Sequence, residues 1–526
     1  MNYIDYIFIG AYILLFLFLG QYFSKNKNSE DYFLGGKSFG WFPLSMSTIA
    51  TQLSAISFIS APAFVGLKDN GGMQWLTYEF AVPLAMIFLM VFLIPPMYKA
   101  GIVSVYAYLE KRFATSTRVL LSVVFQVSRA FATSVMVYTV ALILSEVLGI
   151  KMWHTIFIIG IVTLIYSYQG GMKAVVYGDM LQMFILFAGI VICLVAGIQY
   201  IGGWEEFLAG LDRDRLQAVD FQSLGLNNDE FGFWPMLLGG FFLYASYYGT
   251  DQSQVQRLFS AQDMGTVKKT LLFNGLLRFP ITFVYCVMGL VIGTLVIQDA
   301  AFQAAIPNGK PDLMIPIFIR DYLPHGLIGI LLVAILSAAM SSLSSAINSL
   351  SAATVEDLFN RKKQLGIQTQ LKYSKLAALF WGTLCIVLAF FTGDIADTVI
   401  EAINKIGSVF YGPILATFIA AIGIKKINAT GINLGILAGV LVNIYLWQFV
   451  PEIFWFWWNA IGAIVTLSVA WLISSMDGEN VKTQGEDQIE SFNKIFTAQD
   501  KRYISILIIF FIVILIVSLS VPAIFS

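Results

Sequence analysis

Residues 337–357 read SAAMSSLSSAINSLSAATVED, and this hydroxyl-rich stretch continues an almost purely apolar run at 327–336. The pattern predicts a hydrophobic helix whose serines recur mostly at three- and four-residue steps, so much of their oxygen faces one side; they are Ser337, Ser341, Ser344, Ser345 and Ser349. Hydroxyl groups at membrane depth suit a hard cation, such as sodium, that must shed its water. Helix–helix packing explains the pattern equally well, because serine and small residues are common at such interfaces.

The composition of the whole chain places this helix in a membrane protein. Of the 526 residues, 58% are hydrophobic and 12% are charged, and the mean hydropathy is +0.78, whereas a soluble domain carries about 25% charged residues. The apolar residues form long continuous runs, which favour spanning helices over the alternating strands of an outer-membrane barrel. The three cysteines, Cys193, Cys286 and Cys385, lie in separate apolar runs and predict no metal or disulfide framework.

Fourteen hydrophobic runs in the chain are candidate membrane spans, because each is close to the length of about 20 residues that crosses a bilayer. They lie at 4–22, 42–66, 78–98, 119–148, 154–170, 176–201, 233–250, 271–297, 326–352, 373–392, 397–423, 430–449, 453–475 and 502–524. The first run lacks a basic segment before it and a small-residue cleavage site after it. We therefore expect a retained helix rather than a signal peptide.

Lysine and arginine set the orientation of these spans. With the amino terminus outside, 22 of these residues fall on the cytoplasmic side, 6 fall outside, and the remaining three lie within the spans. The cytoplasmic set includes Arg118, Arg257 and Lys268. An error in the number of spans would scramble this asymmetry. The sequence therefore predicts fourteen spans in the plasma (inner) membrane, with both termini extracellular or periplasmic.

Two of the spans are interrupted by polar residues. The span at 42–66, FPLSMSTIATQLSAISFISAPAFVG, is rich in serine and threonine, and the span at 233–250 turns polar as it continues into DQSQVQR. Unwound backbone at membrane depth is tolerated where it lines a cavity or binds an ion, and interrupted helices in two halves point to a transporter site. Because these spans are five apart, spans two to six and seven to eleven are consistent with two inverted repeats.

This arrangement predicts a division of the chain into consecutive segments. They are an extra helix and cytoplasmic loop at 1–41, a first five-helix repeat at 42–201, an extracellular loop at 202–232, a second repeat at 233–424, two accessory helices at 425–475, a cytoplasmic linker at 476–501 and a last helix at 502–526. The repeat is inferred from the positions of the interrupted spans, and the two halves share no visible sequence identity.

Charged side chains inside the spans are functional candidates, because a charge at membrane depth is costly unless it is paired or solvated. They are Glu79, Arg129, Glu146, Asp179, Asp251, Arg278, Glu401 and Lys405. Glu146 and Glu401 lie near the ends of their spans, where a long side chain reaches the interface. For Arg129, Asp179 and Arg278, which lie deeper, we expect a role in binding a solute or ion or in structural pairing.

Three motifs resemble the sodium:solute symporter family. Residues 166–174, YSYQGGMKA, followed by VVYGDMLQ, are similar to its signature, and residues 249–259, GTDQSQVQRLF, are similar to its motif after a broken seventh helix. The serine helix followed by INSLSAATVEDLF resembles its sodium helix, close to the branch that carries monocarboxylates, vitamins and iodide. The resemblance implies an all-α integral membrane protein with a LeuT-type fold, a 5+5 inverted repeat with about 14 transmembrane helices.

The resemblance also implies two sodium sites. The first takes backbone carbonyls of the broken helix and groups on the serine helix, which match Ala50, Leu53, Ala338, Ser341 and Ser342. The second, present in only some members, matches Asp179, Ser344 and Ser345, with Ser341 shared. Since no group is missing, two sodium ions per cycle are expected. The chemistry agrees, because neutral oxygens suffice for one monovalent ion and a carboxylate offsets a second. The alternative role of Asp179 is to cap a helix start.

The solute positions of sugar-carrying members match Gln52, Ser57, Glu79, Asp251, Arg278 and Asn404. Glu79, in the sequence TYEF, resembles a glutamate that binds sugar, whereas Ser57, Asp251 and Arg278 depart from the residues usual there. Arg129 resembles an arginine that grips the carboxylate of sialic acid in related carriers, and a guanidinium pairs naturally with a carboxylate. Glu79, Asp251 and Asp179 are alternative internal partners for Arg129.

The predicted function is a sodium-coupled symporter that imports a small polar organic solute (a sugar, polyol or sugar acid) by alternating access. A sodium-coupled monocarboxylate, vitamin or anion symporter is the alternative. A channel would need a continuous polar stripe and a sensor would need a signalling domain, neither of which the sequence shows. No nucleophile–base pair, phosphate loop or nucleic-acid signature occurs, so neither an enzyme nor a nucleic-acid partner is expected. The expected partners are the solute, sodium and the lipid bilayer, with no obligatory protein partner.

Overall fold

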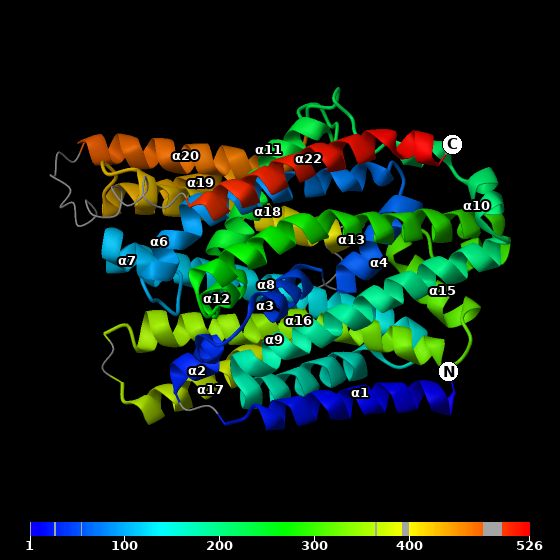
Figure 1. Cartoon of the computed structure of the whole chain (residues 1–526), viewed down its shortest axis with the longest axis horizontal. Helices are drawn as coiled ribbons and strands as arrows, with labels where there is room; N and C mark the ends of the chain where they lie inside the picture. The colour runs from blue at the N-terminus through cyan, green and yellow to red at the C-terminus, as the bar shows by residue number, and fades with distance from the viewer. Residues whose placement is uncertain are drawn as a thin grey trace.

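The computed structural model describes residues 2–25, 28–53, 55–362, 365–391, 399–476 and 497–525. Helices make up the regular structure of these residues, apart from one isolated bridge between Phe39 and Ala261. The long helices share a common direction (Figure 1), and many large apolar side chains stand exposed on the outer helices. An apolar outer surface of this extent suits lipid rather than water.

The first half of the chain forms α1 (Tyr3–Tyr22), α2 (Ser29–Leu34), η1 (Gly35–Lys37), α3 (Trp41–Gln52), α4 (Ala55–Gly66), η2 (Met73–Phe80), α5 (Ala81–Phe88), η3 (Leu89–Leu93), α6 (Ile94–Lys99), α7 (Ala107–Arg112), α8 (Thr115–Leu148), α9 (Met152–Ile201), α10 (Trp204–Gly210), η4 (Arg213–Leu216), α11 (Phe233–Thr250) and α12 (Gln252–Phe259).

The second half forms α13 (Met264–Gln298), α14 (Ala300–Ala305), η5 (Pro311–Leu313), α15 (Met314–Tyr322), α16 (Leu327–Ala353), η6 (Thr354–Phe359), α17 (Ile367–Ala389), α18 (Val399–Gly423), α19 (Ala429–Phe449), α20 (Phe456–Met476) and α22 (Ala498–Ile524). Most of the predicted cytoplasmic linker at 476–501 lies outside the described residues.

Many of these helices have the length and apolar character of membrane spans. Among the described residues there are 11, or up to 12 if α3 and α4 count as one bent span. Helix α9 is 50 residues long and contains Gly171 at a non-helical φ of 55° and ψ of −149°, so it consists of two helices joined at this glycine. The positive φ explains the glycine, because a side chain there would be strained. The all-helical membrane fold is confirmed, and the count of fourteen spans stays a prediction.

Both interruptions predicted from polar residues are present. Helices α3 and α4 meet at a bend of 55°, and Leu53, at the end of α3, has a non-helical φ of −82° and ψ of 83°. Helix α11 ends at Thr250, and Asp251 is extended before α12 begins at Gln252. Breaks of this kind leave the last carbonyl groups of the first half-helix without intrahelical partners.

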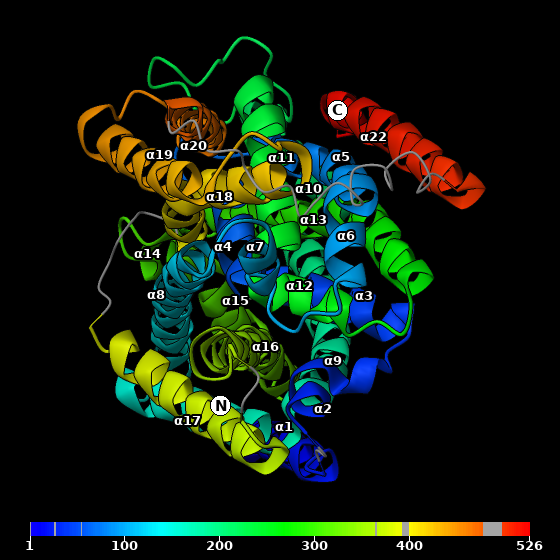
Figure 2. The same ribbon diagram turned by 90° about the vertical axis from the view of Figure 1, so that its left-hand side faces the viewer.

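The serine helix is the central element of the bundle. Figure 2 shows α16 inside a ring of other helices, with α1, α17, α19, α20 and α22 at the rim. It packs against α3 and α4 of one broken span, against α12 of the other, and against α8 and α9. Figure 1 places both chain termini at one end of the bundle and α2, α6 and α7 at the other, which agrees with an even number of crossings.

One close helix contact fixes the position of α4. A methyl group on Gly66 would lie 2.1 Å from the carbonyl oxygen of Gly289 in α13. Small residues allow two helix backbones to approach in this way inside a membrane. The contact holds the half-helix after the break against α13, and both helices contribute walls to the central cavity.

Three basic residues that charge counting assigns to cytoplasmic loops are buried in ion pairs instead. Arg257 pairs with Asp179, Arg118 pairs with Asp357, and Lys268 pairs with Asp500. For Arg257, which is 1% exposed, the loop assignment was wrong. The positive-inside rule counts basic residues near the ends of spans. A count of this kind does not distinguish a solvated side chain from one that pairs with a buried carboxylate.

Candidate functional site

A central cavity of about 150 Å³ lies where the two broken spans meet α16. Its walls come from α3, α4, η2, α8, α11, α12, α13, α16 and α18. Of the residues predicted to contact a solute, it is lined by Gln52, Ser57, Arg129, Asp251, Arg278 and Asn404. Aromatic rings, including Trp75, Tyr78, Tyr106, Tyr247 and Tyr411, form much of the remaining surface. Ligand pockets are commonly apolar with a few convergent polar groups, and this cavity fits that description.

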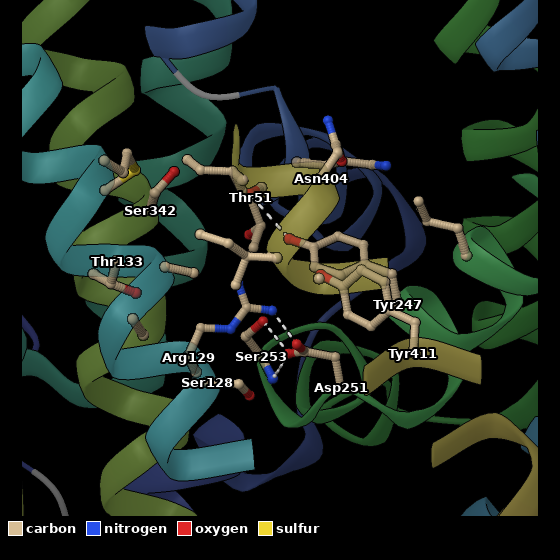
Figure 3. A pocket seen from close by; sticks show the side chains of 18 of the residues that line it. Thr51, Ser128, Arg129, Thr133, Tyr247, Asp251, Ser253, Ser342, Asn404 and Tyr411 are labelled. Atoms are coloured by element: carbon tan, nitrogen blue, oxygen red, sulfur yellow. Dashed lines mark hydrogen bonds and ion pairs between the residues drawn. The ribbon is translucent and has the colours of Figure 1, made fainter. Parts of the chain in front are cut away.

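Arg129 and Asp251 form an ion pair in this cavity. Figure 3 shows the guanidinium of Arg129, on α8, reaching Asp251 between α11 and α12. The Arg129 side chain is 15% exposed and that of Asp251 is 8% exposed. The guanidinium also lies 5.3 Å from the centre of the Tyr247 ring, a distance at which a cation is attracted to the ring face. Of the three predicted partners for Arg129, Asp251 is the one in contact.

Asp251 has a second role at the break. Its Oδ1 accepts hydrogen bonds from the backbone N–H and the hydroxyl of Ser253, at 2.8 and 2.5 Å. The aspartate is therefore the N-cap of α12, which satisfies one of the free N–H groups at the helix start. This cap explains why the chain resumes a helix immediately after the interruption.

Glu79 lies behind the cavity rather than in it. Its carboxylate accepts hydrogen bonds from Arg278 Nη2 at 2.6 Å, Arg278 Nε at 3.1 Å and Thr282 Oγ1 at 3.0 Å. Among the described residues that line the cavity, Arg278 is present and Glu79 is not. Arg278 Nη1 is buried and has no hydrogen-bond partner among the described residues. Arg278, rather than Glu79, is therefore the member of this pair with hydrogen-bonding capacity to spare.

Tyrosines position the neutral polar residues of the cavity. The hydroxyl of Tyr78 donates to Asn404 Oδ1 at 3.0 Å, and the hydroxyl of Tyr248 donates to Gln52 Oε1. Figure 3 shows Asn404 and Tyr411, both on α18, across the cavity from Arg129. The two amide groups therefore face the cavity in orientations that neighbouring rings hold.

Several serines of α16 donate hydrogen bonds within their own helix, and others do not. Ser344 and Ser345 donate to the carbonyl of Ser341 at 2.9 and 2.7 Å, and Ser349 donates to Ala346 at 3.1 Å. Hydroxyl groups often return to their own helix in this way. Ser341 instead donates to Asp179 Oδ1 at 2.6 Å, and the Ser342 hydroxyl oxygen is buried without a partner among the described residues. Packing therefore does not account for the whole serine face.

The first predicted sodium set lies around the break in span two. Ala50 lies in the last turn of α3, Leu53 is the residue that follows the helix, and α16 packs against this helix. Ser342 lines the cavity on the α16 side (Figure 3). An unpartnered buried hydroxyl oxygen and backbone carbonyls at a helix end are oxygen donors of the kind that a sodium ion requires.

The second predicted sodium set is centred on Asp179. Its Oδ1 accepts from Ser341, and its Oδ2 accepts from Ser47 at 2.5 Å and from Arg257 Nη2 at 2.7 Å. Arg257 also donates to Ser345. Asp179 is fully buried and lies inside α9, so the alternative role as a helix-start cap is wrong.

Sequence reasoning missed Arg257 and Ser47 at this position. A signal for Arg257 was available in the sequence. Arg257 lies four residues after Ser253, so the two side chains share one face of the helix that begins at the break. Ser47 lies one turn before Thr51 in α3, and Thr51 donates to its carbonyl at 2.8 Å. Both residues belong to helices that the interrupted spans already marked as important.

A model of the sodium:solute symporter family matches residues 32–439. The chain belongs to this family. The frog (Xenopus laevis) sodium-coupled monocarboxylate transporter 1 is 29% identical to it over 84% of this chain and 71% of that protein. The human sodium/iodide cotransporter is 28% identical over 82% of this chain and 67% of that protein. These relatives are transporters, and the resemblance drawn from the three motifs is confirmed.

The fold of this family member matches that of solved symporters. A substrate-bound, outward-open Na⁺-coupled sialic acid symporter superimposes with a TM-score of 0.82 at 24% identity, covering 90% of this chain and 98% of that one. Mhp1, a nucleobase-cation-symport-1 transporter, superimposes more loosely, with a TM-score of 0.51 at 12% identity. The likeness establishes a shared helical transporter fold. Within it, the cavity lies where the two interrupted spans meet α16.

Proposed function

We propose that this protein is a sodium-coupled symporter that imports a small organic anion with one carboxylate, by alternating access around the central cavity. The observation that carries the proposal is that two guanidinium groups, those of Arg129 and Arg278, line one small cavity with aromatic walls. A guanidinium donates hydrogen bonds and accepts none, so this cavity favours solutes rich in acceptors. The monocarboxylate-transporting relatives are consistent with such a solute.

The anion replaces the sugar or polyol as the favoured solute for a physical reason. A sugar hydroxyl donates a hydrogen bond as well as accepting one, and its strongest acceptor in such a site would be a carboxylate. Asp251, which lines the cavity, already pairs with Arg129, and Glu79, which lies behind it, accepts from Arg278. The cavity volume of about 150 Å³ is also below the roughly 300–1,000 Å³ of sites for drug-sized ligands.

A sugar acid is the second candidate. Gln52, Ser57 and Asn404 supply neutral polar groups to the same cavity, and these would pair with hydroxyl groups next to a carboxylate. In this case too the carboxylate would contact Arg129. The two candidates therefore differ in the size and hydroxyl content of the solute, and both require its negative charge.

We further propose that sodium binds at the two predicted sets and that the chain crosses the plasma membrane fourteen times with both termini outside. The 11 apolar helices become 12 spans when α3 and α4 count as one bent span. Counting α9 as two spans and adding α11 as one brings the number to fourteen. The unpartnered hydroxyl oxygen of Ser342 supports the first sodium set. The cluster of hydroxyl groups on Asp179 supports the second.

The proposal is tested by reconstituting the full chain in liposomes and measuring uptake of labelled lactate, gluconate, glucose and iodide with and without an inward sodium gradient. We expect sodium-dependent uptake of lactate or gluconate and none of glucose. Arg129→Lys should raise the half-saturating anion concentration, because an ammonium does not reproduce the planar two-point grip of a guanidinium. Sodium-driven glucose uptake that survives Arg129→Lys would overturn the anion proposal.

A further inference from the structure

The Arg257 guanidinium lies among the groups expected to hold the second sodium ion. It donates to Asp179 Oδ2 at 2.7 Å, to Ser47 Oγ at 2.7 Å and to Ser345 Oγ. Its side chain is 2% exposed and that of Asp179 is 0% exposed. Asp179 thus has a resident positive partner supplied by the protein itself, from the helix that follows the second break.

Sodium and Arg257 require the same atoms. A sodium ion in this set would take oxygen lone pairs of Asp179 and Ser345, and the guanidinium now donates to both residues. Two cations at neighbouring positions would also repel, and the repulsion is strong where water is excluded. Occupation of the set by sodium therefore requires Arg257 to release at least part of its contacts.

The same short helix connects this set to the solute cavity. Arg257 Nη1 donates to the backbone carbonyl of Ser253, and the Ser253 hydroxyl donates to Asp251 Oδ1 at 2.5 Å. Asp251 in turn pairs with Arg129. A continuous run of hydrogen bonds and ion pairs therefore joins Arg129 in the cavity to Asp179 in the sodium set, and Figure 3 shows its cavity end.

The charges of this run balance. Arg129 and Arg257 contribute two positive charges, and Asp251 and Asp179 contribute two negative charges. One added sodium ion leaves one uncompensated positive charge in a buried region, which is costly. One added sodium ion together with one anionic solute leaves the region neutral again.

We propose that Arg257 is a tethered cation that competes with sodium for Asp179 and that an anionic solute relieves this competition. When the solute carboxylate takes Arg129, Asp251 loses its partner and becomes the nearest uncompensated carboxylate to α12. Arg257, already bonded to Ser253 beside Asp251, then shifts toward Asp251 and leaves Asp179 to sodium. Arg257 is thus a positioning residue that makes the second sodium ion depend on the solute, and this inference rests on the proposed function.

The test is the direct binding of ²²Na⁺ to the purified full chain, with and without choline lactate. We expect Arg257→Gln to bind sodium roughly 10- to 100-fold more tightly than the unmodified protein in the absence of lactate, the range spanned by hydrogen bonds to charged groups. Arg257→Lys keeps the charge but loses the fork of donors, so its sodium affinity should fall between the two. Lactate should tighten sodium binding in the unmodified protein and have little effect in Arg257→Gln.

The direction of the change separates this role from a structural one. Damage to a buried network would weaken sodium binding, whereas relief of competition strengthens it. Lys268→Gln is the matched control, because it removes another buried cation, the partner of Asp500, and should leave sodium affinity unchanged. If Arg257→Gln does not fold, the comparison of Arg257→Lys with the unmodified protein decides.

Unchanged or weaker sodium binding in the folded Arg257 variants would overturn the inference. The proposed function has a separate readout, which is sodium-driven uptake by the unmodified protein. If the unmodified protein shows sodium-driven uptake but the sodium affinity does not change when Arg257 is substituted, only the tethered-cation inference is refuted. Absence of both sodium binding and sodium-driven uptake in the unmodified protein refutes the proposed function.

Discussion

Replacing Asp251 by asparagine separates its two roles at the cavity. Asparagine caps a helix about as well as aspartate, so the hydrogen bond from the Ser253 backbone at 2.8 Å is expected to persist. The negative charge that now occupies Arg129 is lost. If the solute is an anion that competes with Asp251 for this guanidinium, Asp251→Asn should bind it more tightly.

The magnitude follows from the contact that the solute no longer has to displace. A hydrogen bond to a charged group contributes about 1.5–3 kcal/mol, and the Arg129–Asp251 pair is largely buried. The solute's own contact with Arg129 forms in both proteins and therefore cancels in the comparison. The lower end of this range is about 1.5 kcal/mol. Because about 1.4 kcal/mol corresponds to a tenfold change, we expect the half-saturating anion concentration to fall roughly tenfold.

The assay is the concentration dependence of labelled lactate binding to purified protein at saturating sodium, because binding avoids effects on the transport cycle. Asp263→Asn is a suitable control, since Asp263 caps α13 through Thr266 at 2.8 Å outside the cavity. A weaker affinity in Asp251→Asn, with an unchanged affinity in the control, would refute the competition. That result would instead make Asp251 a direct hydrogen-bond acceptor for the solute.

Three further substitutions probe the sodium sets and the Glu79 pair. Ser342→Ala should raise the half-saturating sodium concentration for uptake several-fold, whereas Ser349→Ala, which removes a hydroxyl bonded within its own helix, should not; equal responses would assign Ser342 to packing. Asp179→Asn should lower the sodium Hill coefficient of uptake toward one, and a coefficient already near one in the unmodified protein would contradict a second ion. Glu79→Ala should lower the melting temperature of the purified protein, because removing one partner of a buried ion pair costs about 3–5 kcal/mol; unchanged melting would show that Arg278 finds another partner.

The architecture was largely predictable from the sequence, because it depends on features that are local in the chain. Polar residues inside an apolar span predict an interruption, and the breaks at Leu53 and Asp251 are where the sequence turns polar. The helix turn at Gly171 was not predicted as such, although the runs on either side of it were separated. The apolar sequence on both sides of Gly171 indicates helix, but it does not show the position at which one helix turns into the next.

The pairing of charges was less predictable, because it depends on which helices meet. Arg129 had three possible partners in the sequence, and only the tertiary structure, in which its guanidinium reaches the second break, selects Asp251. Glu79 and Arg278 are 199 residues apart, and each looked available to a solute when considered alone. Arg257 was assigned to a loop because its helix is short and follows the interruption, yet that helix carries it into the interior.

The most direct test of the central claim is simultaneous flux of ²²Na⁺ and labelled lactate into liposomes that contain the unmodified protein. Sodium-coupled symport of an anion predicts that each flux requires the other species and that the anion accumulates above its outside concentration while the sodium gradient lasts. Replacing sodium by potassium should abolish the accumulation. Lactate entry that equilibrates without accumulating, at the same rate with either cation, would contradict the account.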